Sequence, residues 1–250
     1  MKKHSRKWAL LIALLTALLL VLMWITITDV PPTTAQIETV GVRALNTQDK
    51  SSITTLSRWA KQGFPIAQRE LGLVLSVSPN SYIEAHKWLE KAAAAGDVDA
   101  QFEMAEANYK ARLGLQQNFV EAWKWYKSAA KQHNSKASFM LARMAKYGEG
   151  NPPDLAISVN WLKQSSAEGN AQAMFLLANA YTAGEGVEQD AIKAREWLER
   201  SAEGDYPVAI HELSLLLEGS AKITGSDPLL ARHLRKEATD ERTLRWNKYQ

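Results

Sequence analysis

Small and aromatic residues recur along the chain with a period of about 36 residues. In each copy a small residue stands three positions before a tryptophan, and another small residue stands four positions after it. The four copies read AHKWLEKAAAAGD (85–97), AWKWYKSAAKQHN (122–134), SVNWLKQSSAEGN (158–170) and AREWLERSAEGD (194–205). Residues at this spacing lie on one face of a helix, so each copy predicts an amphipathic helix. The period predicts an array of helical repeats.

A second helix follows each tryptophan-containing helix. Its marker is an alanine followed four positions later by Leu or Met; the alanines are Ala67, Ala100, Ala137, Ala173 and Ala209. Two residues join the helices in each copy: Gly96-Asp97, His133-Asn134, Gly169-Asn170 and Gly204-Asp205. Glycine favours the left-handed C-terminal cap, and Asn or Asp caps the next helix. These pairs predict tight antiparallel helical hairpins, with His133 in the left-handed conformation.

The N-terminal segment has a separate pattern. Residues 8–28 contain no charged side chain and would span about 30 Å as a helix, which matches the core of a bilayer. Four basic residues precede them (Lys2, Lys3, Arg6, Lys7). We therefore predict a cytoplasmic tail (1–7) and an uncleaved transmembrane signal anchor (8–28), with the rest of the chain across the membrane. The alternative is a cleavable signal peptide, for which Thr33-Thr34-Ala35 is a poor cleavage site.

The remaining chain divides by pattern. Residues 29–51 read as a linker that begins with Pro31-Pro32 and includes an irregular helix over 37–45. Residues 52–239 read as about five helix pairs, the first over Ser52–Ser76, and residues 240–250 as a C-terminal cap. The predicted fold class is an all-α solenoid of antiparallel helix pairs after one transmembrane helix.

Composition narrows the function. The chain has 30 basic and 27 acidic residues, and its excess of three positive charges lies in residues 1–30, so the exported part is neutral. It lacks the basic footprint of a nucleic-acid-binding protein. The absence of cysteine excludes disulfides, zinc–thiolate sites and thiol catalysis. The five histidines form no metal-binding spacing, and no nucleotide-binding or hydrolase motif is present. We predict no catalytic, cofactor-binding or metal-binding residues and no enzyme activity.

Three motifs together resemble a known family. They are the W-[LY]-x-x-[AS]-[AS] helix, the G-[ND]-x-x-A turn, and the G-E-G loops Gly148-Glu149-Gly150 and Gly184-Glu185-Gly186. In combination they are similar to Sel1-like repeats, which belong to the tetratricopeptide-like superfamily. The resemblance implies a right-handed solenoid that binds proteins. It departs at Leu234, which stands where the last segment would carry its tryptophan.

The candidate binding residues are those at which the copies differ. The repeat tryptophans (Trp88, Trp125, Trp161, Trp197) are predicted to be core by register, and Tyr109, Tyr147 and Tyr181 to be packing residues. Trp123 stands two positions before a repeat tryptophan, where the other copies have His86, Val159, Arg195 and Arg232. That position is expected to face solvent, so Trp123, His86, Arg195 and Arg232 are the predicted partner-binding residues. The alternative is that Trp123 packs on the preceding loop, Lys110–Gln117. An enlarged loop over Ser220–Asp227 is a further candidate.

These features predict a protein-binding module tethered to the inner membrane of a Gram-negative cell and facing the periplasm. The leading role is an adaptor or regulator of an envelope protein, with a protein partner that the sequence does not identify. One alternative, implied by the family resemblance, is an immunity protein that neutralises a secreted toxin such as a phospholipase. A second alternative is a structural or glycan-contacting envelope component, which would need a row of exposed aromatic residues.

Overall fold

The fold is all-α. The structure, a computed structural model, describes residues 31–224, with side chains as far as Leu217. This part forms eleven α-helices and one short 3-10 helix, Pro79–Ser81. The helices are α2 (Thr34–Thr47), α3 (Lys50–Lys61), α4 (Pro65–Leu75), α5 (Tyr82–Ala94), α6 (Val98–Tyr109), α7 (Phe119–Ala130), α8 (Ser135–Tyr147), α9 (Leu155–Ala167), α10 (Ala171–Ala183), α11 (Ala191–Glu203) and α12 (Pro207–Thr224).

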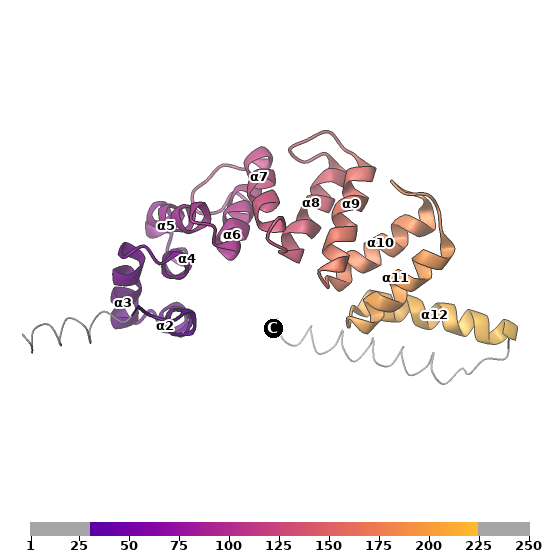
Figure 1. The fold of residues 1–250 in the computed structure, drawn as a ribbon, viewed down its shortest axis with the longest axis horizontal. Helices are drawn as coiled ribbons and strands as arrows, with labels where there is room; N and C mark the ends of the chain where they lie inside the picture. The colour runs from indigo at the N-terminus through magenta and orange to yellow at the C-terminus, as the bar shows by residue number, and fades with distance from the viewer. Residues whose placement is uncertain (1–30, 225–250) are drawn as a thin grey trace, which may run out of the picture.

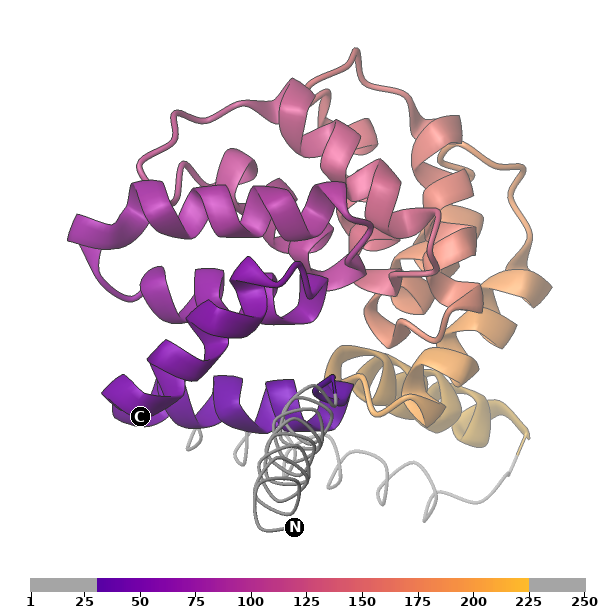
Figure 2. The ribbon, with the colours of Figure 1, turned by 60° about the vertical axis from the view of Figure 1, so that its left-hand side comes forward.

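The helix pairs stack side by side into an arc (Figure 1). Helices α4, α6, α8 and α10 line its inner side, and α5, α7, α9 and α11 form its outer side. Helices α2 and α12 lie at the two ends of the arc (Figures 1 and 2). Each helix packs mainly on its neighbours in sequence, as expected of a solenoid, except that α2 packs more on α4 than on α3. We call the exposed surface of α4, α6, α8 and α10 the inner face.

The predicted register of small residues is confirmed. The five marker alanines of the inner helices, Ala67 to Ala209, are fully buried. In the later repeats some of the small residues of the outer helices are serines, and their hydroxyls donate hydrogen bonds to the neighbouring inner helix. The Oγ atoms of Ser158, Ser165 and Ser201 donate to the carbonyl oxygens of Ala142, Ser135 and Ala171 at 2.8, 2.7 and 2.6 Å. Close helix approach is therefore achieved without an unpaired hydroxyl at these three positions.

The repeat tryptophans are only partly core. Trp88, Trp125, Trp161 and Trp197 pack against the hydrophobic clusters but remain half-buried. Basic side chains lie over two of the rings, with Lys91 Nζ 4.6 Å from the ring centre of Trp88 and the Arg200 guanidinium carbon 4.8 Å from that of Trp197. The tryptophans predicted to be core by register therefore contribute to the core without being fully buried.

Three of the four predicted hairpin turns are confirmed. Gly96, His133 and Gly169 are left-handed, with φ of 94°, 62° and 88°, and the Asp or Asn that follows each one caps the next helix. In the fourth copy Gly204 stands seven residues after Trp197, whereas Gly96, His133 and Gly169 stand eight residues after their tryptophans, so Asp205 is the equivalent residue. Gly204 therefore ends α11 with φ −83°, and Asp205 takes the left-handed position with φ 56°.

The two G-E-G loops share one geometry. The first glycine of each, Gly148 or Gly184, is the left-handed cap of the preceding inner helix. The second glycine lies against the preceding outer helix: a Cβ on Gly186 would overlap the carbonyl oxygen of Leu155, and one on Gly150 would be 2.7 Å from that of Phe119. Each loop is therefore docked on the repeat before it.

Both ends of the described chain differ from expectation. The segment predicted as an irregular helix over 37–45 is a regular helix, α2, with a capping box between Thr33 and Gln36. At the other end α12 continues through Thr224, so residues 220–224 are helical and the predicted loop over Ser220–Asp227 is wrong for them. Within residues 31–224 no helix is long and apolar enough to cross a membrane. The predicted anchor, residues 8–28, and the predicted cap, residues 240–250, lie outside the described residues.

Candidate functional site

Charge is unevenly distributed along the inner face. Helix α6 carries three acidic residues and no basic one (Asp99, Glu103, Glu106), whereas α8 carries three basic residues and no acidic one (Lys136, Arg143, Lys146). Helix α10 has no charged residue. Basic neighbours offset the acidic residues of α6, because Asp99 pairs with Arg69, Glu103 with Arg112 and the buried Glu106 with Lys110. The basic residues of α8 can orient a partner that carries acidic groups.

A pocket opens on the inner face between α8 and α10. It has a volume of about 250 Å³, and α9 forms its base. Val159 and Leu162 from α9, together with Ala142 from α8 and Ala180 from α10, give it an apolar interior. We call this the α8–α10 pocket. An apolar interior with a few polar groups at the edge is typical of binding sites.

The rim of the α8–α10 pocket is exposed and partly basic. Tyr147, at the end of α8, is 65% exposed, and Leu155, at the start of α9, is 41% exposed. Arg143 and Lys146 lie on the same wall; Lys146 Nζ donates to Glu185 Oε2 at 2.9 Å. Within residues 31–224 no carboxylate lies within ion-pair distance of Arg143. Tyrosine and arginine are both enriched among the hot-spot residues of protein interfaces.

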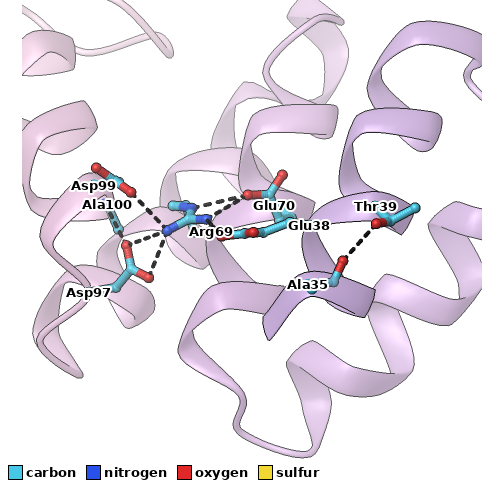
Figure 3. Close-up of polar contacts among 8 residues, drawn as sticks. All are labelled: Ala35, Glu38, Thr39, Arg69, Glu70, Asp97, Asp99 and Ala100. Carbon is cyan, nitrogen blue, oxygen red and sulfur yellow. Dashed lines mark hydrogen bonds and ion pairs between the residues drawn. The ribbon is translucent and has the colours of Figure 1, made fainter. Parts of the chain in front are cut away.

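A second hollow on the inner face is a cleft of about 540 Å³ between α4, α6 and the start of α8. Arg69 lies at its wall and bonds four carboxylates (Figure 3). Its guanidinium nitrogens are 2.8 Å from Glu70, 3.1 Å from Asp97, 3.1 Å from Asp99 and 3.6 Å from Glu38. The network joins α2, α4 and the start of α6, and three negative charges remain in excess. Its buried members make it a structural connection between the first helices.

Glu103 lies in the same cleft. Burial raises the pKa of its carboxyl above the usual range, and the guanidinium of Arg112, 3.7 Å away, offsets only part of that rise. Within the described residues no group of acidic and histidine side chains has the arrangement of a metal site. The cleft can accept a positively charged side chain, but its geometry does not indicate a reaction.

The predicted partner-binding residues are not gathered into one site. His86 is half-buried on α5, Trp123 is half-buried on α7 and packs against the central core, and Arg195 is exposed on α11 and pairs with Glu199 at 2.8 Å. Arg232 lies outside the described residues. Their shared position does not uniformly face solvent, because Val159 is only 3% exposed. Their role in binding stays a prediction.

Sequence reasoning missed Tyr147. It was predicted to be a packing residue, as Tyr181 is, yet its side chain points into solvent at the rim of the pocket. Two signals in the sequence were available. Val159 stands where the preceding copy has Trp123, and all the charged residues of α8 are basic. Neither signal identifies a pocket until the inner helices are placed beside each other.

Comparison with solved structures places the chain among known repeat proteins. A protective antigen of uropathogenic Escherichia coli with an SLR fold is 28% identical, with a TM-score of 0.70, over 83% of this chain and 46% of the antigen. The chain thus spans less than half of the antigen's length. A Sel1 repeat protein from Oxalobacter formigenes is 25% identical, with a TM-score of 0.66, over 82% of this chain and 85% of that one. An immunity protein from Pseudomonas aeruginosa is 18% identical, with a TM-score of 0.48, over 84% and 80% of the two chains. Similarity at that last level does not indicate a shared function.

Comparison with curated proteins finds no match. The family model described as Sel1 repeat matches four consecutive segments, residues 65–97, 98–134, 135–170 and 171–206. These segments are contiguous and cover more than half of the chain. Each contains one inner helix and the outer helix that follows it, which agrees with the helix pairs of the structure. The chain belongs to the Sel1 repeat family.

Proposed function

We propose that this protein is a non-enzymatic binding module that holds a partner polypeptide against its inner face. Sel1 repeat proteins are generally scaffolds for protein interactions and not enzymes. A solenoid presents an extended curved surface in place of a closed active site. The inner face of this chain combines the basic residues of α8 with an apolar pocket, and that combination suits a polypeptide better than a small metabolite.

The observation that carries this proposal is the position of Tyr147. Among residues 31–217 it is the one aromatic side chain that is exposed; the others are buried or half-buried. It lies at the rim of the α8–α10 pocket, on the same wall as Arg143. Because tyrosine and arginine are enriched among interface hot spots, Tyr147 and Arg143 are the candidate anchors for a partner.

The same observation argues against a glycan-contacting component. That role requires several exposed aromatic rings along one groove, and within residues 31–217 Tyr147 stands alone. A polypeptide partner is the better-supported ligand class.

We further propose that residues 8–28 tether the module to the inner membrane, with the repeats in the periplasm. The support is the charge-free segment preceded by four basic residues. A C-terminal alkaline phosphatase fusion, which is active only in the periplasm, tests this topology. Strong activity agrees with the proposal. An inactive phosphatase together with an active cytoplasmic reporter at the same position would refute it.

The binding proposal is tested by photo-crosslinking in cells. A photoreactive amino acid at Asn179, on the inner face, is expected to crosslink one specific partner. The same amino acid at Lys127, exposed on outer helix α7, is expected to give none. Crosslinking from Lys127 and not from Asn179 would place the interface on the outer side and overturn the proposal.

The crosslinked partner then separates an adaptor from an immunity protein. An immunity protein abolishes the activity of a toxin at equal concentration, and its deletion makes cells sensitive to neighbours that secrete the toxin. An adaptor changes the location or the regulation of an envelope protein and gives no such sensitivity. A toxicity assay with the deletion strain distinguishes the two roles.

A further inference from the structure

We propose that the α8–α10 pocket receives one bulky apolar side chain of the partner, and that a carboxylate next to that side chain in the partner bonds Arg143. The inference rests on the proposed function, because the occupant is a segment of the partner polypeptide. It adds the chemistry by which that segment is recognised.

The α8–α10 pocket is open because three of the side chains that line it are smaller than the side chains at the same positions one repeat earlier. Three pocket-lining residues, Val159, Leu162 and Ala180, stand one repeat after larger residues at the same positions. The larger residues are, in the same order, Trp123, Tyr126 and Met144. Aromatic side chains carry much more volume than the aliphatic ones that replace them, so the same gap between inner helices stays open one repeat later.

The preceding gap shows what fills such a space. The ring of Tyr126 is fully buried there, with its centre 5.7 Å from that of Phe102 and 6.3 Å from that of Tyr109. Trp123 packs on the same hydrophobic cluster. The chain thus fills one gap with its own aromatic side chains and leaves the next open. An apolar side chain from outside would supply the missing contacts.

The size of the pocket selects the class of occupant. Pockets for small molecules generally have volumes of about 300–1,000 Å³. The α8–α10 pocket, at about 250 Å³, is smaller and holds one large side chain. Leu155 and Tyr147 extend the apolar surface outward from it and can cover the main chain on either side of the inserted residue.

The charge of the rim selects the neighbours of that side chain. Arg143 lacks a carboxylate partner within the described residues, and Lys146 forms an ion pair with the half-exposed Glu185. The opposite wall, α10, offers the uncharged amides of Gln172 and Asn179, seven residues apart and therefore on one face of the helix. These amides can donate to and accept from the main chain of an extended segment. The rim favours Asp or Glu beside the apolar anchor.

The test uses the full chain, immobilised through a C-terminal tag, to select from a random 12-residue peptide library displayed on phage. Selected peptides are expected to be enriched at least tenfold in sequences with a bulky apolar residue within two positions of Asp or Glu. Val159→Trp places in the pocket the residue that the preceding repeat carries, and it is expected to lose this enrichment. Its thermal midpoint, compared with that of the parent chain, establishes that it is folded.

A second variant makes the test independent of filling the pocket. Arg143→Glu is expected to shift the selected neighbours from acidic to basic residues while the apolar anchor is kept. Lys127→Glu, an exposed change on the outer helix α7, is the matched control and is expected to select the same peptides as the parent chain. No enrichment, or an enrichment that Val159→Trp and Arg143→Glu both leave unchanged, would overturn the inference.

Two further outcomes separate this inference from the proposed function. If Asn179 crosslinks a partner but Val159→Trp binds it with undiminished affinity, the inner face is an interface and the pocket is not its anchor. If the chain self-associates and Val159→Trp abolishes the self-association, the occupant is a second copy of the chain and the inference is wrong. Sedimentation of both proteins measures this directly.

Discussion

The hydroxyl of Tyr109 donates a 2.9 Å hydrogen bond to Oε2 of Glu149, which is the middle residue of the first G-E-G loop. One repeat later Lys146 Nζ donates to Oε2 of Glu185 at the same distance. Tyr109 and Lys146 hold the same position in successive inner helices. The glutamate of the G-E-G motif is thus a connection between repeats, and no ligand is needed to explain it.

The first prediction concerns these two connections. Burial and the hydrogen bond to Glu149 raise the pKa of Tyr109, which indicates that its hydroxyl is partly shielded from water. Tyr109→Phe should therefore lower the free energy of unfolding by about 1 kcal/mol. Lys146→Met should change it by about 0.5 kcal/mol or less, because Lys146 and Glu185 are both exposed. Urea titrations of the two variants provide the comparison; a larger loss for Lys146→Met would contradict the assignment.

The second prediction separates backbone conformation from close approach. Gly169 and Gly186 both have positive φ, 88° and 70°, but a Cβ on Gly169 would meet nothing within 4 Å. Gly169→Ala should cost about 1 kcal/mol, the strain of a left-handed alanine. Gly186→Ala carries the same strain and also forces the loop away from the carbonyl of Leu155, which should add about 1–3 kcal/mol. Equal thermal midpoints for the two variants would show that the loop is not closely docked.

The third prediction concerns the network around Arg69. Arg69→Met leaves the carboxylates of Glu70 and Asp97 buried without their counter-ion, so the free energy of unfolding should fall by about 3–5 kcal/mol. Arg195→Met is the control, because the Arg195–Glu199 pair is exposed and should contribute about 0.5 kcal/mol or less. Denaturant titration measures both. A loss below about 1 kcal/mol for Arg69→Met would mean that the network does not hold the first helices together.

The fourth prediction is a pH dependence at Glu103. Its pKa is raised in the folded chain, chiefly by burial, so the folded state binds more protons than the unfolded state above the ordinary carboxyl pKa. The contribution of Glu103 to the free energy of unfolding is therefore most favourable at low pH and is lost as the pH rises through the pKa of Glu103 in the folded state. Glu103→Gln should be at least as stable as the parent chain at pH 7, and this advantage should vanish near about pH 3.

Thermal melts from pH 3 to pH 8 test the prediction at Glu103. Glu90→Gln, an exposed change on α5, is the control and should follow the parent profile. If Glu103→Gln is less stable than the parent chain at pH 7 and equal to it at pH 3, the charged carboxylate contributes stability and the argument from burial is wrong.

The repeat register could be predicted from the sequence because it depends on properties that every copy shares. The marker alanines, the left-handed His133 and the caps at Asp97, Asn134 and Asn170 all follow from local spacing and backbone preference. The same reasoning misplaced the fourth turn, because the Gly204-Asp205 pair stands one residue closer to its tryptophan than the other pairs do, and the left-handed position, eight residues after the tryptophan, falls on Asp205. The left-handed position follows the distance from the repeat tryptophan and not the place of the glycine.

The candidate site could not be predicted in the same way, because it depends on differences between copies that lie next to each other only after folding. The difference between Val159 and Trp123 does not by itself indicate a pocket. The pocket is apparent only in the structure, where α8 and α10 form its walls and Val159 lies between them. The basic residues of α8 can be read from the sequence, but only the structure shows that two of them, Arg143 and Lys146, lie beside the pocket. Tyr147 was assigned to packing because its position near a helix end does not reveal its exposure.

The most direct test of the account compares two exposed apolar residues on opposite sides of the solenoid. Tyr147 lies on the inner face at the pocket rim, and Ile192, 75% exposed, lies on outer helix α11. With the partner identified by crosslinking, calorimetric titration should show that Tyr147→Ser raises the Kd at least about tenfold, which corresponds to about 1.4 kcal/mol. Ile192→Ser should leave the Kd within about twofold of the parent value. An unchanged Kd for Tyr147→Ser together with weaker binding by Ile192→Ser would place the interface on the outer face and contradict the account.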